Sequence, residues 1–375
     1  MTRLLATAAL LALLSGCGDG QPFFDDGTPP PTDPTSPTDP TDPGDVIGPG
    51  LPPGTVNPRP NRDIRRVEAR NDAMGGYAER YTYNAANDTF SVDNLAFDGF
   101  NVYQRSGQAD SQTVFEGSTV GGSVGPGTLG GYAVYEAAIQ VNDFLTDEPI
   151  DQITPYRAIY GVSTNTAEND AGNRVPRTAF AIVRTGGYVP YGFGGFIYER
   201  NGGVTLPPDQ FRGQARWNGE YAGMRVFDGA GGMEFTRADA EVRIDFYDFN
   251  RNEGVRVNLT NREAFDESGR PIALGNDTEA GELPLPNIRS VIAEGVPYIT
   301  ANGEIQGGIF SSYVDVDGNR VDYEQGVYYG IIAGDVTSGA DGGEIVGILV
   351  INSDDPRAGR DGVTVQETGG FIVYR

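Results

Sequence analysis

Carboxylates are the side chains in this sequence that could do chemistry. The chain has 52 Asp and Glu residues and no His, so it has no Ser-His-Asp or Cys-His arrangement and no His-ligated zinc site. A glycosidase would need two carboxylates facing each other across a cleft. Pairs such as Glu220 with Glu241, or Asp245 with Asp248, are expected by coincidence among so many acids. The sequence therefore predicts no catalytic residue, no metal ligand and no cofactor.

Two acidic turns resemble calcium-binding loops. Residues 315–319 read Asp-Val-Asp-Gly-Asn, but their Gly is in the fourth position, whereas an EF-hand loop has Gly in the sixth. An Asp-Gly pair between two apolar runs is also typical of a β-hairpin turn. We interpret this stretch, and the similar stretch 248–254, as turns between strands.

An aromatic, glycine-rich stretch holds the candidate partner-contact residues. Between Gly186 and Phe196 it contains Tyr188, Tyr191, Phe193 and Phe196 itself. Exposed aromatic side chains are frequent anchors of protein interfaces. The alternative is a strand–turn–strand unit with buried rings, which is the more common arrangement. These four residues are the candidate contact surface that the sequence offers.

The elements that would position these residues are all strands. Between 214 and 375, β-branched and aromatic runs alternate with turn residues. In 238–249, Val242, Ile244 and Phe246 share one face, so one face should pack inward and the other should meet water. Strands are expected at 214–226, 238–249, 254–261, 304–314, 321–334, 344–351 and 370–374. Seven or eight strands are enough for a small filled barrel without free edges.

The first half of the body reads as a second all-β unit. Strands are expected at 77–83, 89–95, 99–105, 132–141, 156–163, 178–185 and 195–199. No long segment has a period of 3.6 residues, and a helix is expected at 141–145 at most.

The N-terminal residues have the pattern of a targeting signal. Arg3 precedes the apolar run Leu4–Leu14, which is shorter than the roughly 20 residues that span a bilayer as a helix. The run ends in Leu-Ser-Gly and Cys17, the single Cys of the chain, and this pattern resembles a bacterial lipobox. The resemblance implies a signal peptide at 1–17, lipidation of Cys17 and, because Gly18 follows it, attachment to the outer membrane. The alternative is an ordinary secretory signal.

Residues 18–61 read as a disordered tether. They are dominated by Pro, Thr, Asp and Gly, and cannot bury enough apolar surface to fold. The whole chain has a net charge of −25, and its basic residues form no cluster in the sequence. Nucleic acid is therefore excluded as a partner, and contact with the membrane is expected through the lipid anchor alone.

Several motifs, taken in order, resemble the family of transferrin-binding protein B and factor H binding protein. They are Leu206-Pro-Pro, Gly213-Gln-Ala-Arg-Trp-Asn-Gly219, Ile244-Asp-Phe246, Gly326-Val-Tyr-Tyr-Gly330 and Gly369-Gly-Phe371. The resemblance implies an all-β fold in one lobe, with a handle-like β domain at 62–206 and an eight-stranded antiparallel barrel at 207–375. Members of this family are carried to the cell surface and bind host proteins or haem carriers there. Their partner-binding loops do not align with this chain, so no binding residue is transferred.

The expected function is therefore a surface lipoprotein that is not an enzyme and that binds an unknown partner protein or small ligand. Two alternatives remain open. One is a secreted hydrolase that uses carboxylates on an extracellular polymer. The other is a passive envelope lipoprotein.

Overall fold

The structure is a computed structural model, and it describes part of the chain. The described residues are 62–68, 78–93, 95, 102–106, 127–142, 146–151, 155–186, 191–208, 213–248, 252–275, 278, 281–290 and 299–375. Cys17, the expected tether and residues 249–251 of the turn at 248–254 lie outside them. All regular secondary structure assigned within these ranges is β-strand. A search of the same ranges for an apolar helix long enough to cross a membrane finds none.

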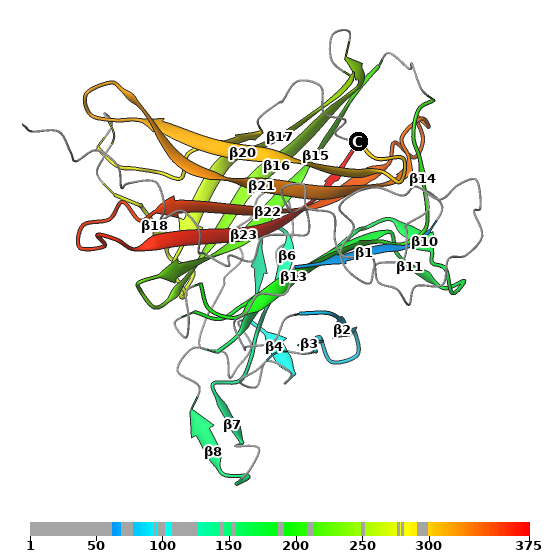
Figure 1. The fold of residues 1–375 in the computed structure, drawn as a ribbon. Helices are drawn as coiled ribbons and strands as arrows, with labels where there is room; N and C mark the ends of the chain where they lie inside the picture. The colour runs from blue at the N-terminus through cyan, green and yellow to red at the C-terminus, as the bar shows by residue number, and fades with distance from the viewer. Residues whose placement is uncertain are drawn as a thin grey trace, which may run out of the picture.

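The C-terminal part is a closed antiparallel barrel of eight strands (Figure 1), as predicted. Its strands, in order around the wall, are β15 (Gln214–Asp228), β16 (Met233–Asp248), β17 (Asn252–Phe265), β19 (Ile288–Ser290), β20 (Glu304–Val314), β21 (Arg320–Asp335), β22 (Glu344–Asp354) and β23 (Thr364–Tyr374). The last strand closes the barrel because it pairs with both β22 and β15. Short β18 (Pro271–Ile272) pairs with β17, and β14 (Val204–Thr205) pairs parallel to β21.

The barrel is filled by one face of each strand. Along β15, Trp217 and Tyr221 point into an apolar core that also holds Val242 and Ile244 from β16. Val242 and Ile244 therefore lie inside the barrel, as the alternation predicts. Phe246 is partly buried and packs against the same core. The indole Nε1 of Trp217 donates to a backbone carbonyl at 3.2 Å, which satisfies the buried polar atom of the ring.

The N-terminal part is a curled antiparallel sheet. Its strands, in spatial order, are β1 (Ile64–Val67), β13 (Gly194–Arg200), β12 (Thr178–Arg184), β9 (Arg157–Val162), β6 (Tyr132–Glu136), β4 (Tyr103–Arg105), β3 (Thr89–Val92) and β2 (Tyr81–Asn84), with β5 (Thr128–Leu129) beside β6. Two hairpins project from it: β7 (Gln140–Asn142) with β8 (Pro149–Asp151), and β10 (Thr166–Glu168) with β11 (Arg174–Pro176). The helix expected from residue 141 is wrong at its start, because Val141 pairs with Ile150 across the first hairpin.

This sheet packs against one side of the barrel. Its inner face meets outward side chains of β15, β21, β22 and β23 in a shared apolar core. The Phe180 ring lies so close to β23 that a Cβ on Gly370 would come within 2.4 Å of it. The buried guanidinium of Arg200 donates to the backbone carbonyls of Asn302 at 2.7 Å and Ile332 at 3.0 Å. The two parts therefore form one body.

The opposite side of the barrel is not covered by this sheet. We call it the free face: the outer surface of β19, of residues 254–263 of β17 and of residues 306–314 of β20, with residues 214–220 of β15 and 237–246 of β16. The excluded ends contact the N-terminal part, since Phe265 of β17 lies in the shared core and Glu304 of β20 pairs with Arg66. Along β15 the outward residues change at the boundary, from polar Arg216 and Asn218 to apolar Ala222 and Met224, which enter the shared core. The pattern of one strand thus divides the barrel wall into a docked part and a free part.

The acidic stretch 315–319 is the turn between β20 and β21, as predicted. The Asp315 side chain accepts hydrogen bonds from the backbone N–H of Asp317 at 3.0 Å and of Asn319 at 2.7 Å. The same bonds from Asn319 lower the pKa of Asp315. Its carboxylate is therefore used to hold the turn.

Candidate functional site

The aromatic stretch is largely part of the interior. The Phe196 ring is fully buried between the sheet and the barrel, and Phe193 is 8% exposed in the core on the other side of the sheet. The half-buried Tyr191 shares a hydrogen bond with Thr364 Oγ1 at 2.5 Å. Tyr188 lies outside the described residues. Phe193 and Phe196 thus fit the buried alternative, because core packing takes up their rings, and a partner contact at this stretch stays a prediction.

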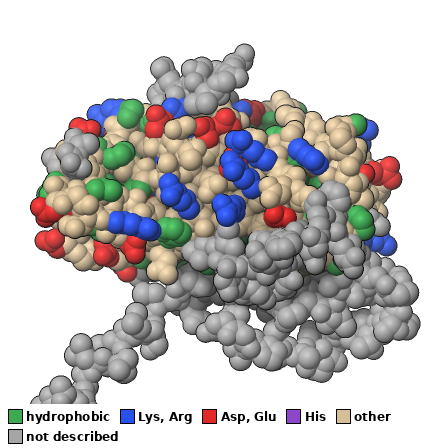
Figure 2. All heavy atoms as spheres, turned by 90° about the horizontal axis from the view of Figure 1, so that it is seen from above, with side chains coloured by type: hydrophobic (Ala, Val, Ile, Leu, Met, Phe, Trp, Pro, Cys, Tyr) green, Lys and Arg blue, Asp and Glu red, His purple; other side chains and the backbone are tan. Residues whose placement is uncertain are grey.

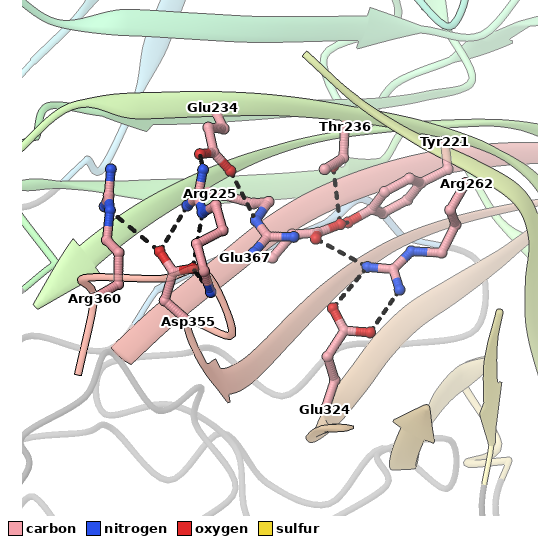
Figure 3. Close-up of polar contacts among 10 residues, drawn as sticks. Tyr221, Arg225, Glu234, Thr236, Arg262, Glu324, Asp355, Arg360 and Glu367 are labelled. Carbon is pink, nitrogen blue, oxygen red and sulfur yellow. Dashed lines mark hydrogen bonds and ion pairs between the residues drawn. The ribbon is translucent and has the colours of Figure 1, made fainter. Parts of the chain in front are cut away.

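One end of the barrel interior holds a set of charged side chains instead of an apolar core. Residues two apart on a strand share a face, so Arg225 lies on the same inner side of β15 as Trp217 and Tyr221. Its cross-strand neighbours are Glu234 on β16 and Glu367 on β23. We call the following set the interior network: Arg225, Arg262, Arg357, Arg360, Glu234, Glu324, Glu367 and Asp355 (Figure 3).

Arg262 of β17 is the centre of the network. Its guanidinium donates to both carboxylate oxygens of Glu324, at 2.6 and 3.0 Å, and to Glu367 at 2.9 Å. It also donates to the carbonyl of Pro286 at 2.6 Å, which ties the segment before β19 to the barrel. Bidentate pairs of this kind are the strongest that arginine forms.

Neutral donors complete the bonding of the two glutamates. The Tyr221 hydroxyl and Thr236 Oγ1 donate to Glu367 at 2.7 and 2.8 Å. Ser311 Oγ donates to Glu324 at 2.5 Å. Tyr221 lies directly against Gly369, where an added Cβ would come within 2.0 Å of its hydroxyl oxygen.

The rest of the network reaches the barrel mouth. Arg225 Nε lies 3.4 Å from Glu234 Oε2, and Arg357 from the loop before β23 pairs with the same glutamate. Arg357 also pairs with Asp355 at 2.6 Å, and Arg360 lies 3.5 Å from Asp355. Figure 3 shows these side chains converging from several strands and one loop.

The charges of the network balance, since it contains four arginines and four acids. Burial alone would raise the pKa of Glu324, but its pairing with Arg262 outweighs burial and holds that pKa below its ordinary value. Burial likewise opposes the charge of Arg262, and Glu324 and Glu367 raise its pKa instead. Glu324 is therefore held ionised, and its chemistry is structural rather than acid–base.

A groove opens in the barrel wall beside the network. Because β19 spans Ile288–Ser290 only, the ends of β17 and β20 have no full strand between them. The groove has a volume of about 1560 Å³. Its apolar lining includes Ile272, Leu285 and Phe310, and Arg320 lies over the Phe310 ring at 5.5 Å. Its mixed lining suits an amphipathic ligand or an extended peptide.

A second hollow, of about 770 Å³, lies on the free face over β15, β16 and β17, and its lining is mostly polar. Glu220 and Asp239 lie there directly opposite each other on neighbouring strands. Burial, and then the charge of Asp239, raise the pKa of Glu220. Within the hollow, Glu220 and Asp239 most resemble the two facing carboxylates that a glycosidase uses. Among the described residues no cluster of three or more Asp, Glu, Cys or His could hold a metal ion.

Sequence reasoning missed both the network and the polar hollow. Arg262, Glu324 and Glu367 are far apart in the sequence, and only the strand pairing brings them together. A usable signal was present at Glu234 and Thr236, which are polar positions that alternate with the apolar Met233 and Phe235.

Comparison with solved structures finds a weak resemblance. The chain is similar to a mutant of the vaccine antigen transferrin binding protein B from Haemophilus parasuis Hp5, with 10% sequence identity and a TM-score of 0.29. The match covers 79% of this chain and 65% of that chain, so the protein spans just under two thirds of the length of that antigen. No protein-family model and no curated protein matches the sequence.

Proposed function

We propose that this protein is a lipid-anchored surface protein that binds a partner protein or small ligand and does not catalyse a reaction. In this proposal the signal ends at Cys17, acyl chains on Cys17 hold it to the outer membrane, and residues 18–61 form a tether. A handle-like domain at 62–206 and the barrel at 207–375 form the body that meets the partner. The lipobox pattern supports the anchoring part of the proposal.

The groove between β17 and β20 is the observation that carries the binding part. It combines apolar side chains with arginines at a break in the barrel wall. In this region Ser312–Val314 of β20 pairs with β21 on one side, while β19 reaches only to Ser311 on the other. An extended segment could therefore add main-chain hydrogen bonds to that edge.

The interior network supports the same conclusion because it fixes the walls of the groove. Arg262 joins β17 to β21, to β23 and to the carbonyl of Pro286. Both Arg262 and Pro286 line the groove. A site with fixed walls loses little conformational entropy on binding.

The test uses the full chain with Cys17→Ser, so that it is not acylated, as bait in the native medium. Val314→Glu places a charge at the mouth of the groove, where Val314 is 48% exposed. We expect this change to abolish partner capture. Val162→Glu is the matched control, since Val162 is 39% exposed on the N-terminal sheet. Capture of no partner, or equal capture by both variants, rejects the groove as the binding site.

The second candidate is a hydrolase, and Glu220 with Asp239 is the observation that favours it. A carboxyl group with a raised pKa beside a second carboxyl group is the kind of arrangement that an acid–base pair uses. It ranks second because the two residues lie side by side on one sheet face rather than across a cleft. Release of reducing ends from an extracellular polysaccharide by the wild type, but not by Glu220→Gln, would establish it.

A further inference from the structure

Three arginines lie in a row across the free face. Arg216 of β15 is directly opposite Arg243 of β16, which is directly opposite Arg256 of β17. All three side chains are exposed, Arg216 to 58% and Arg243 to 54%. We call them the arginine row. Basic side chains gather in the middle of the face seen in Figure 2, although the chain as a whole is acidic.

The row is only partly neutralised. Glu241 pairs with Arg216 Nε at 2.6 Å and with Arg243 Nε at 2.7 Å. Burial opposes the charge of Glu241, but hydrogen bonds from Arg243 and Asn258 and the charges of Arg243 and Arg216 together outweigh burial and hold the pKa of Glu241 below its ordinary value. Within the described part of the chain, Arg256 has no ion-pair or hydrogen-bond partner.

The fold does not require this arrangement. Like charges directly opposite each other across strands destabilise a sheet. The row does not bury apolar surface, because its members are exposed. In a chain with a net charge of −25, an exposed row of guanidinium groups is best explained by a ligand of the opposite sign.

The surroundings of the row indicate the class of ligand. All three arginines line a hollow of about 490 Å³, together with the side chains of Gln214 and Asp245. The neighbouring 770 Å³ hollow adds the polar side chains of Asn218, Asn258 and Thr260. It also holds the carboxylates of Glu220, Asp239 and Glu241, so the anionic groups of a ligand would lie at the arginine row rather than in this second hollow. Guanidinium groups bind carboxylate or sulfate. Amide and hydroxyl groups both donate to and accept from the hydroxyl groups of a ligand, whereas carboxylates only accept from them.

We propose that the arginine row binds an acidic saccharide, with carboxylate or sulfate groups on neighbouring sugar units held by guanidinium groups from adjacent strands. The backbones of neighbouring strands lie about 4.8 Å apart, so the three arginines start from regularly spaced positions on the sheet. The proposal rests on the proposed binding function and assigns a ligand class to a different part of the free face from the groove.

Two other classes of anionic ligand fit less well. A protein interface has an apolar or aromatic centre. The outward side chains around the row are almost all polar. A single-stranded nucleic acid needs aromatic side chains for stacking, which neither hollow has in its lining.

The test is a calorimetric titration of the full chain carrying Cys17→Ser. The probes are oligogalacturonate, sulfated dextran oligomers and neutral dextran oligomers of the same length. We expect binding of at least one acidic probe, no binding of the neutral one, and weaker binding as ionic strength rises. Absence of binding to both acidic probes overturns the proposal.

Three variants locate the site. Arg256→Gln removes one charge without breaking a contact, so we expect about tenfold weaker binding, the effect of losing one charge-assisted hydrogen bond. Glu241→Gln frees two guanidinium groups, so we expect severalfold tighter binding. Arg174→Gln, an equally exposed arginine on β11, should change nothing. Equal losses in Arg174→Gln and Arg256→Gln would mean that only net charge matters, and would overturn the assignment.

Two further measurements separate this inference from its neighbours. Tighter binding of polyglutamate or of an oligothymidylate than of either acidic saccharide would overturn the ligand class. Val314→Glu should leave the saccharide affinity unchanged, and a loss in this variant would place the saccharide in the groove instead. Intact saccharide binding without partner capture would reject the groove alone.

Discussion

The barrel handles arginine in two opposite ways. In the interior network every arginine faces an acid, and the charges balance. In the arginine row Glu241 pairs with Arg216 and Arg243, and Arg256 has no ion-pair partner among the described residues. Burial explains the difference. An unpaired charge in the protein interior is very unfavourable, whereas water and salt screen an unpaired charge on the surface. The charges of the interior network must therefore balance for the chain to fold. The arginine row on the surface can carry excess positive charge, which is available for binding a ligand.

The largest expected effect is the loss of the central arginine. Arg262→Met leaves Glu324 and Glu367 buried without their cation, so we expect a loss of about 3–5 kcal/mol in the free energy of unfolding. Urea denaturation followed by tyrosine fluorescence measures it. The same change in the row, Arg256→Met, should alter stability by less than about 1 kcal/mol. Similar losses in the two variants would break the comparison.

The next effect tests how tightly the two regions are packed. In Gly369→Ala the new methyl group would meet the Tyr221 ring, which the hydrogen bond to Glu367 holds in place. We expect a loss of about 1–3 kcal/mol by the same denaturation measurement. Gly254→Ala, beside the row, is the control, because nothing lies within 4 Å of its added Cβ. Unchanged stability of Gly369→Ala would show that the side chains around Tyr221 can shift to accommodate the methyl group.

Acidification should also distinguish the two regions. The folded pKa of Glu324 lies below its ordinary value of 4.5. Its stabilisation is therefore complete above that value and is lost as the pH falls through the folded pKa. Glu324→Gln should have a flatter decline of unfolding free energy with falling pH than the wild type. Glu241→Gln should stay closer to the wild-type profile, because its partners Arg216 and Arg243 are more than half exposed and water screens these ion pairs. Identical profiles for all three proteins would contradict this.

The smallest expected effect has the opposite sign. Arg256→Gln removes a like charge opposite Arg243 and breaks no contact, so we expect a gain of about 0.2–1 kcal/mol at low salt. Thermal unfolding at low and high salt measures it, and the gain should shrink at high salt. A clear loss of stability would mean that the row supports the fold, and would weaken the case for a ligand.

Much of the architecture could be predicted from alternation alone. The strand expected at 304–314 has the bounds of β20, and Val242 and Ile244 lie inside the barrel as expected. Both predictions hold because apolar side chains there point to an apolar core.

Alternation failed where the network inverts it. The strand expected at 238–249 begins at Met233, and the strand expected at 370–374 begins at Thr364. In the missed part of β16, Glu234 points into the barrel, while Phe235 points outward to the N-terminal sheet. A polar interior and an apolar exterior reverse the usual pattern, so these segments carry no simple strand signal.

The arginine row could not be read from the sequence at all. Arg216, Arg243 and Arg256 are far apart along the chain, and they meet only because of the register of three strands. A chain without a basic cluster in its sequence can therefore still carry a basic cluster on its folded surface. Register depends on turns and packing along the whole barrel, which local residue patterns do not encode.

The position of β23 has a consequence for the order of folding. This strand joins β22 to β15, which lie near the two ends of the barrel sequence. Six barrel strands separate β15 from β23 along the chain, so the wall becomes a ring only after the strands between them have paired. Closure therefore depends on the most non-local strand pairing in the barrel, and we expect it to be a slow step of folding.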